Sequence, residues 1–170
     1  MAFPSLTKQW HSHSYLSIDP LRAELSQKGK VVAVTGAGGA IGGTIALAFA
    51  KAGATKIALI GRRDGPLQTT KTEIETAIPG TNVQVVHGDI ADADSVRGAF
   101  GNVKKDLGDI DVLICCAGYL SEFKNLEDAD PEDWWKGYEI NVKGAFNCSR
   151  AFLSVAAPGA ILVDISTCVV

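Results

Sequence analysis

The sequence lacks the marks of several protein classes. It has no Cys-x-x-Cys pair and no cysteine–histidine spacing that is typical of a metal site. Its 4 cysteines, which include the adjacent Cys115 and Cys116, do not form the pattern of a disulfide framework. Residues 1–20 contain no continuous apolar stretch of the kind that a secretory signal has. We therefore expect a cytoplasmic protein with reduced thiols and no bound metal ion.

The chain also has little net charge. Its 170 residues carry 16 basic and 19 acidic side chains, which leaves a formal charge of −3 at pH 7. Such a charge gives no field that would hold nucleic acid or an acidic membrane. The apolar share of 46% and the charged share of 21% match an average soluble globular protein, which excludes intrinsic disorder and a coiled coil. We expect about one domain with a sizeable core.

The organisation of the chain changes after residue 29. Residues 1–29 are polar and contain two prolines, so they predict an extended arm that ends in a short helix around Leu21–Gln27. In residues 30–170, short β-branched runs alternate with stretches of helical periodicity. The predicted strands are Val31–Thr35, Lys56–Ile60, Val83–His87, Val112–Cys116 and Ile161–Ile165. The apolar stripes of the predicted helices are Ile41, Ile45 and Phe49; Leu67, Ile74 and Ile78; Val96, Phe100, Val103 and Leu107; and Asn141, Ala145, Cys148 and Phe152.

This alternation is typical of the α/β class. It predicts a doubly wound parallel sheet with helices on both faces. We expect about five strands in the order 3-2-1-4-5, with a ligand at the carboxyl ends of the strands, near the switch point between strands 1 and 4.

A glycine-rich turn follows the first predicted strand. Residues 31–50 carry no charge and have the length of a membrane span, but their five glycines and an early Thr-Gly break favour a strand, a turn and a helix. Glycines let the backbone turn tightly and let a pyrophosphate approach, and the first N–H groups of the helix attract an anion. The residues predicted to bind a dinucleotide here are Thr35, Gly36, Gly38, Gly39, Ile41 and Gly42.

This stretch resembles the TGxxxGxG turn of the short-chain dehydrogenase/reductase family. Thr35, Gly36 and Gly42 match that pattern, whereas Ala40 replaces its middle glycine. The resemblance extends through residues 30–170. It implies a Rossmann-like fold, an NAD(P)(H) cofactor, and hydride transfer between this cofactor and a small-molecule alcohol or carbonyl substrate.

Two arginines follow the second predicted strand. Arg62 and Arg63 stand where an acidic residue would bind the ribose 2′-hydroxyl of NAD(H). Because a guanidinium group suits a 2′-phosphate, we expect NADP(H), with NAD(H) as the second choice. The alternative is that both arginines are solvated on a loop or that one pairs with Asp64.

The resemblance also assigns residues after the third and fourth strands. Asp89 and Ile90 would contact the adenine, although Asp89 could instead cap the helix that begins near Asp92. Ala117 and Gly118 would lie beside the nicotinamide ribose, together with Cys116. Cys115 and Cys116 stand where the family usually has two asparagines, and we expect them to be buried, inert thiols.

The resemblance implies three catalytic residues. Asn141 matches an asparagine that holds a water molecule in a proton relay, and its alternative role is that of a core amide satisfied by the backbone. Thr167 stands at the position of the catalytic hydroxyl, and Ser166 is its neighbour that could substitute for it.

One expected pair is missing from the sequence. No tyrosine is followed by a lysine four residues later, although the family uses such a pair as its acid–base group. We therefore expect a truncated or incomplete oxidoreductase of very weak activity or none, with an exposed edge on the fifth strand and Trp134 and Trp135 packed against the sheet. The alternative functions are a non-catalytic nucleotide-binding or regulatory module and, less favoured, a Rossmann-like scaffold without a ligand.

Overall fold

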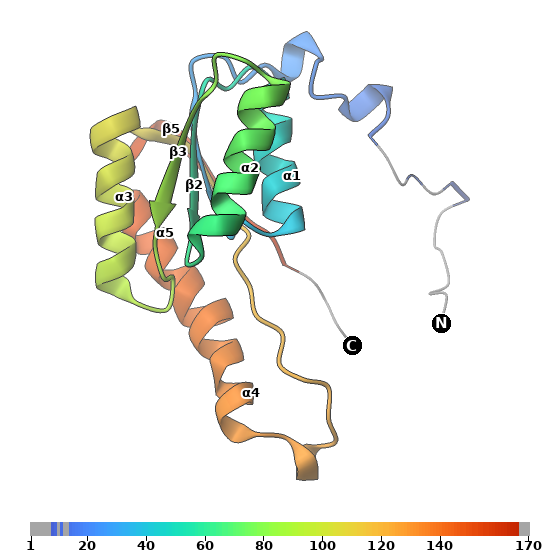
Figure 1. Ribbon diagram of the computed structural model, residues 1–170, viewed down its shortest axis with the longest axis vertical. Helices are drawn as coiled ribbons and strands as arrows, with labels where there is room; N and C mark the ends of the chain where they lie inside the picture. The colour runs from blue at the N-terminus through green and yellow to red at the C-terminus, as the bar shows by residue number, and fades with distance from the viewer. Residues whose placement is uncertain (1–7, 10, 12–13, 167–170) are drawn as a thin grey trace.

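The protein is built around a single parallel sheet. The computed structural model describes residues 8–9, 11 and 14–166, and its five strands have the order β3-β2-β1-β4-β5, with helices on both faces (Figure 1). The strands are β1 (Val31–Thr35), β2 (Lys56–Gly61), β3 (Asn82–His87), β4 (Ile110–Cys115) and β5 (Ala156–Asp164). The α-helices are α1 (Ala40–Lys51), α2 (Asp64–Ala77), α3 (Ala93–Leu107), α4 (Pro131–Tyr138) and α5 (Ala145–Leu153), and the π-helix η4 (Glu139–Gly144) joins the last two. The predicted fold class and strand order are confirmed.

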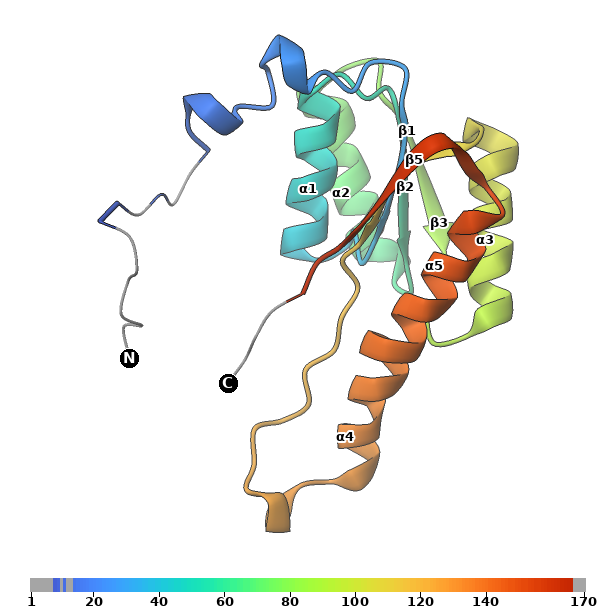
Figure 2. The same cartoon turned by 180° about the vertical axis from the view of Figure 1, so that it is seen from behind.

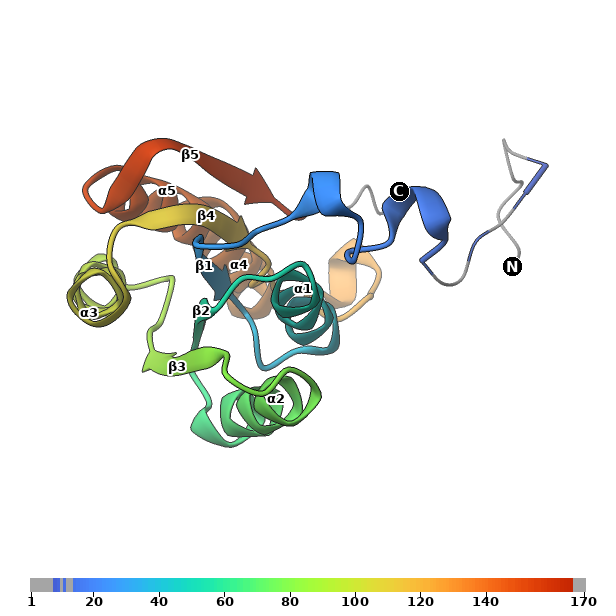
Figure 3. The same cartoon turned by 90° about the horizontal axis from the view of Figure 1, so that it is seen from above.

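The central strand is buried on both faces. All five residues of β1 are buried, because α1 and α2 cover one face of the sheet and α3 and α5 cover the other (Figures 2 and 3). The register sets Thr35 beside Ile60 of β2 and Cys115 of β4. The carboxyl ends of these strands therefore meet at one edge of the sheet.

Helix α1 packs with a different face than the sequence predicts. In the predicted stripe, Ile41 is 64% exposed, and Ile45 and Phe49 are only partly buried. The buried residues of the helix are instead Gly42, Ala46 and Ala50. The reason is the closeness of the helix to the turn before it, since a Cβ atom on Gly42 would lie 2.5 Å from the Gly36 carbonyl oxygen. Only small residues fit on this face.

Helices α2 and α3 follow the predicted pattern more closely. All four residues of the predicted α3 stripe are buried, and Asp92 caps the helix by accepting hydrogen bonds from the N–H groups of Asp94 and Ser95. Leu67 and Ile74 of α2 are buried as well, and Ile78 is partly buried at its end.

The segment before α5 departs from the prediction. The π-helix η4 interrupts the helical repeat, so Asn141 is exposed rather than on the inward stripe with Cys148 and Phe152. Helix α4 projects away from the sheet (Figure 1), which leaves Trp134 and Trp135 50% and 53% exposed. The prediction that they pack against the sheet is wrong, because both contact the ring of Tyr138 on their own helix.

The two ends of the described chain are exposed. Instead of one helix at Leu21–Gln27, the arm has two 3₁₀ turns, η1 (Leu16–Ile18) and η2 (Ala23–Leu25), and neither contains a buried residue that would stabilise a longer helix. Strand β5 lies at the end of the sheet, and Ile161 and Val163 are exposed on it. None of the helices in the described part of the chain is long and apolar enough to cross a membrane.

Candidate functional site

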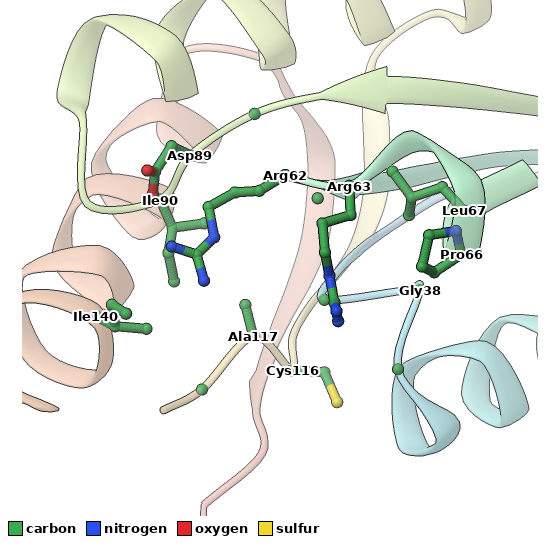
Figure 4. A pocket seen from close by; sticks show the side chains of 15 residues that line it. Gly38, Arg62, Arg63, Pro66, Leu67, Asp89, Ile90, Cys116, Ala117 and Ile140 are labelled. Atoms are coloured by element: carbon green, nitrogen blue, oxygen red, sulfur yellow. The ribbon is translucent and has the colours of Figure 1, made fainter. Parts of the chain in front are cut away.

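A cavity of about 240 Å³ opens at the carboxyl edge of the sheet. It is formed by the segments that follow β1, β2, β3 and β4, so four parts of the chain that are far apart in sequence meet there (Figure 4). The predicted cofactor-binding residues in its lining are Gly36, Gly38, Gly39, Arg62, Arg63, Asp89, Ile90, Cys116, Ala117 and Gly118. Ile41 and Gly42 lie in the first turn of α1, and Thr35 lines an adjacent cavity.

The glycine turn has no room for a side chain at Gly36, Gly38 or Gly42. Gly36 has a φ of 68°, and a Cβ atom on it would lie 2.7 Å from the Cα atom of Ala117. A Cβ atom on Gly38 would lie 2.9 Å from the Cβ atom of Pro66. Ala40 is exposed, so the methyl group that departs from the family pattern points out of this contact.

The same turn presents unpaired backbone donors. Among the residues that the structure describes, the N–H groups of Gly38, Ala40, Ile41 and Gly42 have no hydrogen-bond partner, and Gly39 at the N-cap of α1 offers no side-chain oxygen to them. The positive end of the helix dipole lies at the same place. The turn can therefore bind an anion through its backbone alone.

Thr35 fixes the turn relative to β4. Its Oγ1 atom accepts hydrogen bonds from the N–H groups of Cys116, at 3.1 Å, and Ala117, at 3.3 Å. On the other side, the Oγ1 atom of Thr70 donates to the carbonyl oxygen of Ala37 at 3.0 Å. These contacts fix the residues that follow β4 and the helix α2 at set distances from the turn.

Arg62 and Arg63 extend from the end of β2 over this cavity (Figure 4). Both side chains are exposed, and within residues 14–166 neither forms an ion pair or a hydrogen bond. The alternative pairing with Asp64 is therefore wrong. Two free guanidinium groups at the rim give this end of the cavity a positive charge.

Asp89 and Ile90 form the wall that follows β3. The Oδ1 atom of Asp89 accepts a hydrogen bond from the N–H of Ala91 at 3.0 Å, and since Asp92 caps α3, the alternative role of Asp89 as that cap is wrong. The Nδ2 atom of Asn147, a buried residue of α5, donates to the carbonyl oxygen of Ile90 at 2.9 Å. Asn147 was not among the predicted site residues, although a polar residue stands there one position before Cys148 of the apolar stripe.

A second cavity, of about 580 Å³, adjoins the first on the β5 side. Asn141 and Ser166 both line it, so two of the three predicted catalytic residues come together, whereas Thr167 lies outside the described residues. The amide of Asn141 accepts from the N–H of Tyr119 at 2.8 Å and donates to its carbonyl oxygen at 2.7 Å. The backbone thus satisfies this amide, but on an exposed residue rather than in the core.

The loop before α4 is fixed by a further contact. The hydroxyl of Tyr119 donates a hydrogen bond to the carboxylate of Asp133, which also accepts from the N–H of Glu122 at 3.0 Å. This hydrogen bond raises the pKa of the Tyr119 hydroxyl and lowers the pKa of Asp133. Neither residue was singled out from the sequence.

The cysteines after and within β4 differ in their surroundings. Cys115 is 5% exposed and lies on the α5 side, as predicted for a buried thiol. Cys116 is only partly buried and lines the first cavity, where burial raises the pKa of its thiol. The prediction of a buried residue is therefore wrong for Cys116, because it lies beyond the end of β4 where the strands separate.

Comparison with known proteins agrees with this arrangement. A family model described as short chain dehydrogenase matches residues 30–168. The chain belongs to the short-chain dehydrogenase family. It is 33% identical over 162 residues to the short chain dehydrogenase andI of Emericella variicolor, covering 92% of this chain and 54% of that protein. It is 35% identical over 157 residues to the short chain dehydrogenase pigC of Monascus ruber, covering 87% and 49%.

A solved short-chain dehydrogenase shows the same fold. A short-chain type dehydrogenase/reductase from Mycobacterium ulcerans is 26% identical with a TM-score of 0.77, covering 84% of this chain and 53% of that one. Members of this oxidoreductase family bind an NAD(P)(H) dinucleotide and small-molecule substrates. The chain spans about half the length of the curated relatives it matches.

Proposed function

We propose that this short-chain dehydrogenase binds NADP(H) in the cavity at the carboxyl edge of its sheet, and that the whole protein moves a hydride between NADP(H) and an alcohol or carbonyl substrate. The proposal rests on the unpaired N–H groups at the start of α1, because such groups bind a pyrophosphate. They belong to Gly38, Ala40, Ile41 and Gly42. The lack of a side chain at Gly36, Gly38 and Gly39 lets the phosphates approach the backbone. The residues present therefore fit the dinucleotide.

The choice of NADP(H) over NAD(H) rests on Arg62 and Arg63. Their guanidinium groups lie at the rim of the cavity without a partner of their own in the described residues. A charge-assisted hydrogen bond to a 2′-phosphate contributes about 1.5–3 kcal/mol. Asp89 and Ile90 then form the adenine side of the cavity, and Ala117 and Gly118 form the side of the nicotinamide ribose.

The second cavity is the proposed substrate side. The bound dinucleotide supplies or accepts the hydride there. Asn141 uses one N–H and one oxygen lone pair of its side-chain amide in its two hydrogen bonds to the Tyr119 backbone. The amide therefore keeps one donor and one acceptor for a water molecule of a proton relay. Ser166, with Thr167 next to it, offers a hydroxyl that can polarise a carbonyl. The 170 residues contain no Tyr-x-x-x-Lys pair, so we expect them to bind the dinucleotide with very weak turnover or none.

Titration calorimetry with NADPH and NADH tests this function. We expect tighter binding of NADPH, and Arg62→Ala should weaken NADPH binding roughly 10- to 100-fold while changing NADH binding little. Arg97→Ala is the matched control, because this exposed arginine lies on α3 and pairs with Asp94 outside the cavity.

Three outcomes would contradict the proposal. Binding of neither nucleotide favours the scaffold without a ligand. Tighter binding of NADH than of NADPH, or an unchanged preference in Arg62→Ala, removes the assignment of the arginines. The proposed compartment is the cytoplasm, because the 4 cysteines do not form the pattern of a disulfide framework.

A further inference from the structure

Two buried cysteines from distant parts of the chain meet beside the second cavity. Cys115 at the end of β4 and Cys148 on α5 are 5% and 1% exposed, and both belong to the same apolar cluster between the sheet and α5. Figure 3 shows α5 lying along the strands β4 and β5. Both cysteines also line the cavity of about 580 Å³ that Asn141 and Ser166 share. Both thiols therefore lie in one cluster and beside one cavity, which opens to solvent.

The two thiols interact with each other. The thiol of Cys148 donates a hydrogen bond to the sulfur of Cys115. This hydrogen bond lowers the pKa of Cys115, and together with burial it raises the pKa of Cys148. Cys115 is thus the better nucleophile of the pair, and Cys148 is the thiol that stands beside it to resolve a mixed disulfide.

Cys116 is excluded from this pairing because it packs on the other face of the sheet. Cys116 follows the last residue of β4, packs against the cluster on the α1 side and lines the first cavity, whereas Cys115 belongs to the cluster on the α5 side. Cys116 therefore resembles Cys115 in sequence position but not in surroundings, which makes it a matched control.

We propose that Cys115 and Cys148 form a reversible disulfide that links the carboxyl end of β4 to α5 at the wall of the second cavity. Oxidised glutathione, a small disulfide, serves as the oxidant. The Cys115 thiolate attacks one sulfur of glutathione disulfide and releases one glutathione thiolate. Cys148 then loses its proton and attacks the Cys115 sulfur, releasing the second glutathione. The two cysteines lose two electrons and two protons, and the glutathione disulfide gains them as two thiols.

The disulfide would change the second cavity, which is the proposed substrate side, and not the cavity proposed for the nucleotide. The new bond replaces a thiol–thiol contact between β4 and α5, and it joins the two ends of the segment that carries Tyr119, α4 and Asn141. It does not involve the glycine turn or the arginines. Its test is therefore independent of dinucleotide binding.

The test is oxidation of the folded 170-residue protein in glutathione buffers of increasing oxidised share, followed by acid quenching, alkylation and mass spectrometry. We expect two thiols to disappear together, with a mass loss of about 2 Da that dithiothreitol reverses. The fragmentation spectrum should show one cross-linked peptide pair that contains Cys115 and Cys148. Oxidation of the unfolded protein in urea should instead give a mixture of pairings.

The variants separate this pair from the other thiols. Cys116→Ser should still lose two thiols in one step, whereas Cys148→Ser should form no internal cross-link, with far-ultraviolet circular dichroism confirming that each variant is folded. The cross-link of the unaltered protein decides the matter even if a variant does not fold. The proposal is overturned if Cys115 and Cys148 stay alkylatable at the most oxidising ratio, if they carry glutathione without a cross-link, or if the native cross-link joins other cysteines.

Discussion

Replacing Gly42 by alanine disturbs the contact on which both the fold and the proposed nucleotide site depend. A Cβ atom at this position would lie 2.5 Å from the carbonyl oxygen of Gly36, 2.9 Å from its carbonyl carbon and 3.0 Å from the Cα atom of Ala37. All three atoms belong to the backbone, so no flexible side chain can move aside. Either α1 or the turn must move by about 1 Å to reach an ordinary contact.

The size of the effect follows from two opposing contributions. Overpacking of this kind costs about 1–3 kcal/mol, and replacing glycine by alanine inside a helix returns up to about 1 kcal/mol. We therefore expect the free energy of unfolding to fall by about 1–2 kcal/mol, which lowers the urea midpoint by roughly 0.5–1 M at an ordinary slope. Because the unpaired N–H groups move with the turn, NADPH binding should weaken about tenfold or more.

Urea unfolding and titration calorimetry measure both consequences, with Gly101→Ala as the control. Gly101 is exposed on α3, and a Cβ atom on it would have no neighbour within 4 Å. That substitution should raise the free energy of unfolding by about 0.5–1 kcal/mol and leave NADPH binding unchanged. If Gly42→Ala were as stable as the original protein and bound NADPH equally well, the reasoning from close packing would be refuted.

Two further predictions concern side chains that hold the sheet and its loops. Asp111 accepts hydrogen bonds from the Lys30 ammonium and the Val31 N–H, both at 2.8 Å. Burial raises the pKa of Asp111, but the two hydrogen bonds and the Lys30 charge together outweigh burial and lower this pKa. The stabilisation by Asp111 is therefore complete above the pKa of the unfolded state, near 3.9, and is lost as pH falls through the lower pKa of the folded state. Asp111→Asn should lower the free energy of unfolding by about 1–3 kcal/mol at pH 7 and flatten the acid-unfolding profile. An unaltered profile would contradict this prediction. Asn147→Ala should lower the free energy of unfolding in urea by about 1–3 kcal/mol, because it leaves the buried Ile90 carbonyl without its donor, and equal stability would show that this bond contributes nothing.

The strands and the glycine turn could be predicted because their signals are local. The β-branched run Val31–Thr35 matches β1 residue by residue, and the glycines after it have close backbone neighbours in the structure as a tight turn requires. The buried face of α1 could not be predicted from hydrophobicity. There, the distance between helix and turn decides which residues fit, and Gly42 fits where Ile41 does not.

The second cavity shows the opposite case. The stripe that began at Asn141 assumed a regular helix, but the π-helix η4 changes the rotation per residue and turns that side chain toward Tyr119. A sequence pattern does not reveal such a change, since the partner that stabilises it is the backbone of a loop 22 residues away. The pairing of Cys115 with Cys148 likewise depends on how α5 lies on the sheet.

The proposed function requires that the pyrophosphate of NADP(H) rest on the backbone between Gly38 and Gly42. Nuclear magnetic resonance of the ¹⁵N-labelled protein can detect this contact, because each amide of the turn gives its own signal during a titration with NADPH. We predict that the amide signals of Gly38, Gly39 and Gly42 shift in a saturable way while the signal of Gly101 on α3 stays in place. A titration that shifts no signal of the turn, or only signals far from it, would show that the pyrophosphate does not bind there.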